Sequence, residues 1–233
     1  MPWNKNVSAR FEALVVALGR EFDRDPNLEA VKLPETAPNA NLDKTPQEGV
    51  ETYTDEIETL KRLMLTLRHA FPNTVVIQYT NFPTKLLLQP TDYEKEIGVG
   101  MGGPDVYPGE DAISDPEKGV YRYYANLAGT VPLGAAVQSS NYSVADKKRN
   151  ALGRGYTKLN GMPIVLTPED EIPFPIRAHL RLAQEKLKVN YLFWATHPRR
   201  DFERVRGYLA EPDIARDPAG GLDARIPRKA FRR

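Results

Sequence analysis

The chain has 233 residues, of which 41% are hydrophobic and 27% are charged, a composition typical of a folded domain rather than a disordered segment. Thirty-two basic residues against 31 acidic ones leave a net charge of +1, which argues against a general nucleic-acid or membrane-surface binder. Cysteine is absent, which excludes disulfides, thiolate metal ligands and a cysteine nucleophile. Three scattered histidines, His69, His179 and His197, show no ligand spacing, so we expect no metal site and no cofactor.

The N-terminal residues carry no targeting signal. Residues 1–6 lack the apolar core of a secretory signal, and no apolar run approaches the ~20 residues that cross a bilayer. These features predict a cytoplasmic protein. A secreted or periplasmic location stays open if an N-terminal part is missing.

The first third of the chain is expected to form a helix, a strand and a second helix. Ser8 is a suitable N-cap for a helix through about Arg24, and the apolar run at 28–33 predicts a strand. A loop over 34–49, rich in proline and asparagine, leads to a helix over 51–70. The stripes expected to face the core are Phe11, Leu14, Val15, Leu18 and Phe22 in the first helix, and Ile57, Leu60, Met64, Leu67 and Phe71 in the second.

Two more strands are expected at 75–79 and 97–101. The first is rich in β-branched residues and long enough to be buried on both faces. The segment 84–96 between them has room for a helix of one or two turns. A helix near 115–127 follows, with Val120, Tyr123, Tyr124 and Leu127 as its packing residues.

The last two strands are expected at 131–138 and 189–194, with a helix over 174–187 before the second. The intervening segment 143–173 is long, and long loops are often functional.

A short helix capped by Asp201 is expected to complete a single domain over residues 1–210. Its buried stripe is Phe202, Val205 and Leu209. Residues 211–233 lose apolar periodicity and are expected to form a poorly ordered basic tail.

Strands that alternate with helices predict βαβ units and a parallel α/β sheet. The two large architectures of this kind are the doubly wound sheet and the (β/α)8 barrel. The barrel is favoured because its sites draw on many strand ends, whereas a doubly wound site concentrates at one switch point. Here every expected strand ends on candidate site residues: Glu35, Tyr79 and Asn81, Asp105, Gln138 and Asn141, and Trp194 and His197.

A complete barrel has eight strands and ~250 residues, and this chain supplies five strands. Because the first expected element is a helix, the chain is predicted to be the C-terminal part of a barrel whose N-terminal units are missing. The missing strands would leave two open edges. We therefore expect pairing with another chain or with a missing N-terminal part.

Residues 98–103 match the pattern G-x-G-x-x-G. A dinucleotide site needs a helix directly after this motif, but Pro104 and Pro108 follow it. An NAD site is therefore disfavoured. The glycines instead indicate close backbone packing, or the approach of a ligand to the strand end.

In the order of five segments, the chain resembles strands four to eight of bacterial TIM-barrel glycoside hydrolase-like proteins: 28–35, 75–82, 97–105, 131–141 and 190–194. The resemblance covers about residues 11–208. It implies an acid/base glutamate at Glu35, after the fourth strand, and a sugar-stacking aromatic at Trp194, after the eighth. The chain departs from the pattern at Gln138, where these families place a nucleophilic glutamate, and this disfavours a retaining mechanism.

Glycoside hydrolysis needs an acid that protonates the leaving oxygen and a second carboxylate. Glu35 is the candidate acid, provided that burial at the barrel mouth favours its neutral form. Asp105, two strands away, is the candidate second carboxylate. A strand spacing of ~4.8 Å separates them by ~9–10 Å, closer to the ~6.5–9.5 Å of inverting enzymes than to the ~5–5.5 Å of retaining ones. Their ordinary alternatives are a loop cap or arginine partner for Glu35, and a turn residue for Asp105.

Aromatic rings beside amides suit carbohydrates, whose rings present C–H patches edged by hydroxyls. The expected binding residues are Tyr79, Asn81, Gln138, Asn141, Trp194 and His197. The aromatic side chains are equally compatible with packing under loops, and His197 with a surface position.

The leading hypothesis is a glycoside hydrolase-like protein acting on an oligo- or polysaccharide, with no nucleic-acid or membrane partner. The alternative is a non-catalytic carbohydrate-binding protein or a degenerate barrel fragment, which Gln138 favours. A third hypothesis is an aldolase or phosphosugar-type barrel, for which Lys32 is the in-strand lysine.

Overall fold

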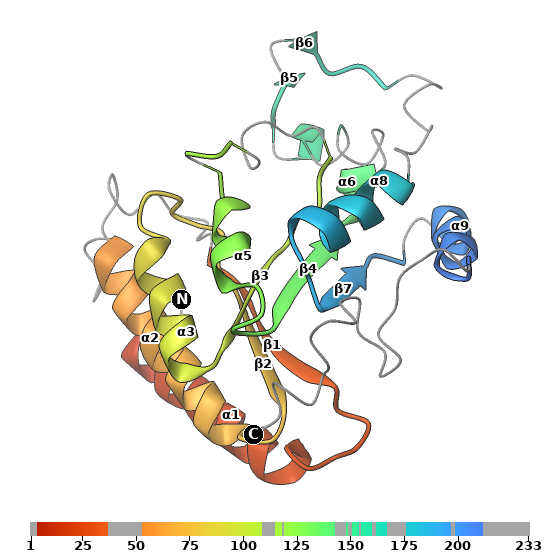
Figure 1. Cartoon of the computed structure of the whole chain (residues 1–233). Coiled ribbons are helices and arrows are strands. Elements are labelled where there is room, and N and C mark those ends of the chain that lie inside the picture. The colour runs from red at the N-terminus through yellow and green to blue at the C-terminus, as the bar shows by residue number, and fades with distance from the viewer. Residues whose placement is uncertain are drawn as a thin grey trace.

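A computed structural model describes residues 4–36, 53–108, 115–117, 119–142, 148, 151–153, 155–159, 162–166, 176–196 and 199–211. Five parallel strands form one sheet in the order β1-β2-β3-β4-β7, which curls into a half-barrel (Figure 1). The expected parallel α/β fold is confirmed. The strands are β1 (Ala30–Glu35), β2 (Val75–Tyr79), β3 (Gly100–Gly103), β4 (Leu133–Val137) and β7 (Tyr191–Trp194).

On the convex side of the sheet, α1, α2 and α3 lie along one flank and α5 and α8 toward the other, whereas α9 lies apart, beyond β7 (Figure 1). Among the described residues, no helix is both long and apolar enough to span a bilayer. The helices are α1 (Lys5–Phe22), α2 (Tyr53–Ala70), α3 (Leu88–Ile97), α5 (Arg122–Leu127), α6 (Ser139–Tyr142), α8 (Ile176–Arg181), the π-helical η2 (Leu182–Lys186) and α9 (Arg199–Leu209). A small antiparallel hairpin pairs β5 (Lys158–Leu159) with β6 (Met162–Pro163).

Alternating side chains divide the apolar residues between the two faces of the sheet. On the convex face, one cluster joins β1 and β2 to α1 and α2 around Met64 and Val76. A second cluster joins β3 and β4 to α5 and η2 around Met101 and Leu133. The concave face carries a third cluster, of Val75, Ile77 and Tyr79 from β2.

The prediction for α1 is wrong at its start and on its buried face. Asn4, not Ser8, caps the helix, and its side chain accepts hydrogen bonds from the backbone N–H groups of Asn6 and Val7. Ser8, Val15 and Gly19 are buried because α1 crosses α2 very closely, and a Cβ at Gly19 would lie 2.2 Å from the Ala70 carbonyl oxygen. The expected core residues Leu14, Leu18 and Phe22 are exposed instead, and Phe11 is partly buried.

The predicted buried stripe of α2 is confirmed, although Leu60 is only partly buried. The predicted packing residues Val120, Tyr123, Tyr124 and Leu127 are all buried, as expected. The predicted third strand at 97–101 is displaced, because α3 continues through Ile97 and ends at Gly98 in the left-handed conformation. The helix predicted near 115–127 is limited to α5, and β7 begins at Tyr191 rather than 189. Asp201 lies inside α9 rather than at its cap. The loop at 37–50 and the tail beyond 211 lie outside the described residues.

The end of α1 is attached to the start of β2 through the Asp23 carboxylate. Its oxygens accept hydrogen bonds from the backbone N–H groups of Asn73 (2.9 Å) and Thr74 (3.0 Å) and from the Asn73 side chain (2.6 Å). Burial alone would raise the pKa of Asp23, but these hydrogen bonds outweigh it and lower the pKa below the usual value of 3.8. The ionised carboxylate therefore stabilises the fold.

We predict that Asp23→Ala destabilises the protein by about 1–3 kcal/mol, because the backbone donors of Asn73 and Thr74 lose their acceptor. A carboxyl group with a lowered folded-state pKa stabilises above its unfolded pKa, and this contribution is lost as the pH falls through the folded-state pKa. Urea unfolding of Asp23→Asn and wild type should therefore differ most near neutral pH and converge in acid. Asp25→Asn is the control, because Asp25 accepts only within its own turn, from Asn27. An equal effect of both variants at all pH values would contradict the prediction.

Candidate functional site

A β-bulge sets the direction of Glu35. In the β1–β2 ladder Leu33 pairs with Gln78 and Glu35 pairs with Tyr79, so Pro34 is an extra residue in β1. Without it, Glu35 would share the helix-covered face with Leu33, because side chains two apart point the same way. The shifted register aligns Glu35 instead with Tyr79, which lies in the concave cluster.

Asn81, just after β2, holds the end of β1. Its Nδ2 donates a hydrogen bond of 2.9 Å to Glu35 Oε2, and its Oδ1 accepts one of 3.3 Å from the Thr36 backbone N–H. Thr36 Oγ1 in turn donates to the Phe82 carbonyl oxygen at 2.6 Å and accepts from the Phe82 N–H at 2.9 Å. Glu35 is exposed and Thr36 is buried. The carboxylate is thus presented at the strand end by a rigid turn.

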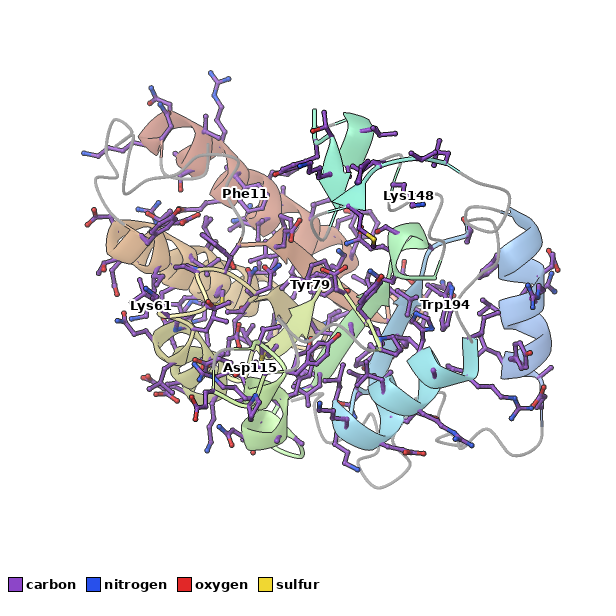
Figure 2. The ribbon with its side chains drawn as sticks, turned by 90° about the horizontal axis from the view of Figure 1, so that it is seen from above. Phe11, Lys61, Tyr79, Asp115, Lys148 and Trp194 are labelled. Atoms are coloured by element: carbon purple, nitrogen blue, oxygen red, sulfur yellow. The ribbon has the colours of Figure 1, made fainter. Side chains whose placement is uncertain are left out.

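Lys32 lies beside Glu35 on the concave side. Its Nζ is 4.1 Å from the centroid of the Tyr79 ring, which also contacts Phe193 edge-on with 6.4 Å between the centroids. Burial lowers the pKa of Lys32, and the negative charge of Glu35 partly opposes this. Burial also raises the pKa of the Tyr79 hydroxyl. Lys32, Glu35 and Tyr79 therefore form one cluster. Tyr79 lies near the middle of the molecule (Figure 2).

A second group of predicted residues meets where β3 and β4 end. Asn141 Nδ2 donates to Asp105 Oδ1 at 2.8 Å, and Asn141 Oδ1 accepts from the Gln138 N–H at 2.8 Å. Gln138 Nε2 donates to the carbonyl oxygen of Pro104 at 3.0 Å. Asn141 is 4% exposed, so it positions Asp105 and Gln138 rather than offering a free amide.

Trp194 lies on the convex side of β7, toward α8 (Figure 2). It packs against the second convex cluster, and its ring meets that of His179 edge-on at 6.0 Å. His179 is fully buried, and its Nε2 lies 3.0 Å from the Asn141 carbonyl oxygen. The predicted His197 lies outside the described residues.

The predicted residues thus gather in two groups at one edge of the sheet: Glu35 with Tyr79 and Asn81, and Asp105 with Gln138 and Asn141. Sequence reasoning missed Thr36 and His179, which carry no local signal, and treated Lys32 only as an in-strand lysine. The proline inside β1 was a signal for the bulge, because proline in strands is confined to edges and bulges.

Within the described ranges, no three potential metal-ligating side chains gather at a common point. No protein-family model, curated protein or solved structure matches the chain.

The concave cluster depends on a glycine opposite Tyr79. A Cβ at Gly102 would lie 2.4 Å from Tyr79 Cδ1, so the expected role of these glycines in close packing is confirmed at this position.

We predict that Gly102→Ala destabilises the protein by about 1–3 kcal/mol, because the buried Tyr79 ring has to shift away from Lys32 and Phe193. Thermal unfolding would measure the loss of stability. Gly153→Ala is the control, since a Cβ there meets nothing within 4 Å, and equal effects would contradict the packing argument.

Proposed function

We propose that this protein is glycoside hydrolase-like and acts on an oligo- or polysaccharide at the carboxyl edge of the half-barrel, with Glu35 as general acid. The observation that carries the proposal is the register shift at Pro34, which aligns an exposed carboxylate with Tyr79 at a strand end. Bulges are common beside active sites, where they redirect a side chain.

The surroundings of Glu35 support this role. Asn81 fixes the carboxylate from one side, so the acid is oriented before a substrate arrives. A sugar that covers the edge would remove water from Glu35 and favour its neutral form, which donates the proton to the leaving oxygen.

Asp105 is the proposed second carboxylate. It follows β3, two strands from β1, and a spacing of ~4.8 Å per strand gives ~9–10 Å, near the range of inverting enzymes. In that role Asp105 would accept a proton from the attacking water. The hydrogen bond from Asn141 keeps one of its oxygens in place.

A non-catalytic carbohydrate-binding protein is the second candidate. The observation that favours it is Gln138, an amide at the end of β4, whose Nε2 already donates to the Pro104 carbonyl oxygen. An amide can bind a sugar hydroxyl but cannot act as a nucleophile or base.

The test is Glu35→Gln assayed with a panel of aryl glycosides and, in parallel, with the matching oligosaccharides by calorimetry. We expect the exchange to reduce hydrolysis at least about 100-fold while sugar binding survives, because the amide keeps the shape but carries no transferable proton. Glu96→Gln, an exposed change on α3, is the control.

Equal hydrolysis by wild type and Glu35→Gln would remove Glu35 from the mechanism. Binding of sugar by both proteins without any hydrolysis would favour the carbohydrate-binding candidate.

We also propose that the half-barrel belongs to a (β/α)8 barrel of TIM type, completed by strand–helix units that this chain does not supply. In support, β1 and β7 are both edge strands, and α1 exposes an apolar stripe of Leu14 (53%), Leu18 (39%) and Phe22 (42%). Exposed apolar stripes of this kind mark surfaces that another element covers.

If nothing covers the exposed apolar stripe of α1 in the isolated chain, the protein should self-associate as its concentration rises. Sedimentation velocity would measure this. The double change Leu14→Glu and Leu18→Glu should shift it toward monomer and alter stability by no more than about 0.5 kcal/mol, since both positions are exposed. Met162→Glu with Val165→Glu is the control. Both residues are exposed and apolar, but they lie in β6 and just after it rather than on α1. A wild-type protein that stays monomeric would contradict this part of the proposal.

A further inference from the structure

A cavity of about 440 Å³ lies between the N-terminal turns of α1 and α2 and the ends of β1 and β2. This volume is within the range of small-molecule sites, ~300–1,000 Å³. Its walls are mostly apolar and include two aromatic rings. The principal apolar residues are Phe11, Leu33, Ile57, Leu60, Leu63 and Phe82.

Gln78 of β2 lines this cavity and is fully buried, with 0% exposed. Its Nε2 donates hydrogen bonds to the carbonyl oxygens of Pro34 (2.7 Å) and Tyr79 (2.9 Å), which fixes the orientation of the amide. The remaining atom, Oε1, is buried and has no hydrogen-bond partner in the described part of the chain. A buried acceptor without a partner costs about 1–3 kcal/mol, so it calls for a donor.

Glu56, in the first turn of α2, lines the same cavity. Its Oε2 is buried and also lacks a partner within the residues that the structure describes. Burial raises the pKa of Glu56 to about 7. A helix N-terminus accounts for an acidic residue at this position, but it does not account for an oxygen that is removed from water without a donor.

The charged residues that line the cavity have one sign. Glu35 and Glu56 are its charged lining residues, and no basic side chain is among the described residues that line it. Two acceptors, one carboxyl group that lacks a counter-ion and an apolar wall together define the ligand: an apolar body with a positively charged hydrogen-bond donor at one end.

We propose that the cavity between α1, α2 and β2 binds a small apolar primary amine. Its ammonium group would donate to Gln78 Oε1 and the Glu56 carboxylate, and its body would lie against Phe11 and Phe82. This site is on the helix-covered side of the sheet. It shares Glu35 at its rim with the sugar site proposed at the strand ends, but its recognition groups, Gln78 and Glu56, have no part in the proposed sugar hydrolysis.

The experiment compares three probes that share one apolar body: 4-phenylbutylamine, 4-phenylbutanol and 4-phenylbutyrate. Binding to the full chain is measured by calorimetry and by chemical-shift changes of aromatic and methyl groups. At pH about 8, a carboxyl group with a pKa of about 7 is mostly ionised and can pair with the ammonium group. We expect the amine to bind at least about tenfold more tightly than the alcohol, and the carboxylate to bind least.

Glu56→Gln should reduce the affinity for the amine at least about tenfold and leave that for the alcohol within about twofold. This variant removes a buried charge without changing the shape of the side chain, so it is expected to fold. Glu58→Gln is the matched control on the same helix, since Glu58 is exposed and pairs with Lys61.

Three results would overturn the proposal. Equal binding of amine and alcohol would mean that the cavity selects apolar bodies alone. Equal loss of amine binding in Glu56→Gln and Glu58→Gln, or no loss in either, would remove Glu56 from recognition. Absence of binding by all three probes would mean that the cavity takes no such ligand.

Discussion

The packing of β2 side chains against glycines on the concave face determines the curvature of this sheet. Ile77 and Tyr79 fill the inside of the half-barrel, and neighbouring strands present Gly102 and Gly134 to them. A Cβ at Gly134 would lie 3.1 Å from Ile77 Cδ1, so the Ile77 side chain would have to shift to accommodate a larger residue there. The curled sheet brings Tyr191 of β7 within 3.3 Å of Glu29, just before β1, so the two edges approach each other across the concave side.

The positions of the polar strand ends follow from this curvature. Turns after neighbouring strands are drawn close enough for one amide to connect them, as Asn81 does for β1 and β2 and Asn141 for β3 and β4. On the convex side, α3 is joined to the end of β2 in the same manner, through the hydrogen bond that Thr80 Oγ1 donates to the buried Glu94. Burial raises the pKa of Glu94 well above its usual value, and the hydrogen bond from Thr80 partly opposes this.

The sequence was sufficient for the order of the elements and for the parallel sheet, because strand and helix periodicities are local properties. The strand Val75–Tyr79 and the α2 stripe were predicted correctly for this reason. The face of α1 was not, since its apolar residues cover more than half of the helix and the close approach at Gly19 decides which ones face α2. Glu35 was identified from its place after a strand, but its alignment with Tyr79 depends on a register that only the pairing with β2 defines. The convex placement of Trp194 likewise depends on tertiary packing, here against the His179 ring of α8.

The two convex clusters meet at β3, and this has a consequence for how the molecule opens. Gly100, Gly102 and Gly103 leave Met101 as the β3 side chain in the second cluster, while Val99, just before the strand, belongs to the first. On the convex face, side-chain packing therefore changes partner at β3. The backbone hydrogen bonds of β3 and the concave cluster join the two halves of the sheet there. Regions with separate cores open as separate cooperative units in hydrogen exchange. We therefore expect the half-barrel to open as two such units, with the glycine-rich strand as the boundary between them.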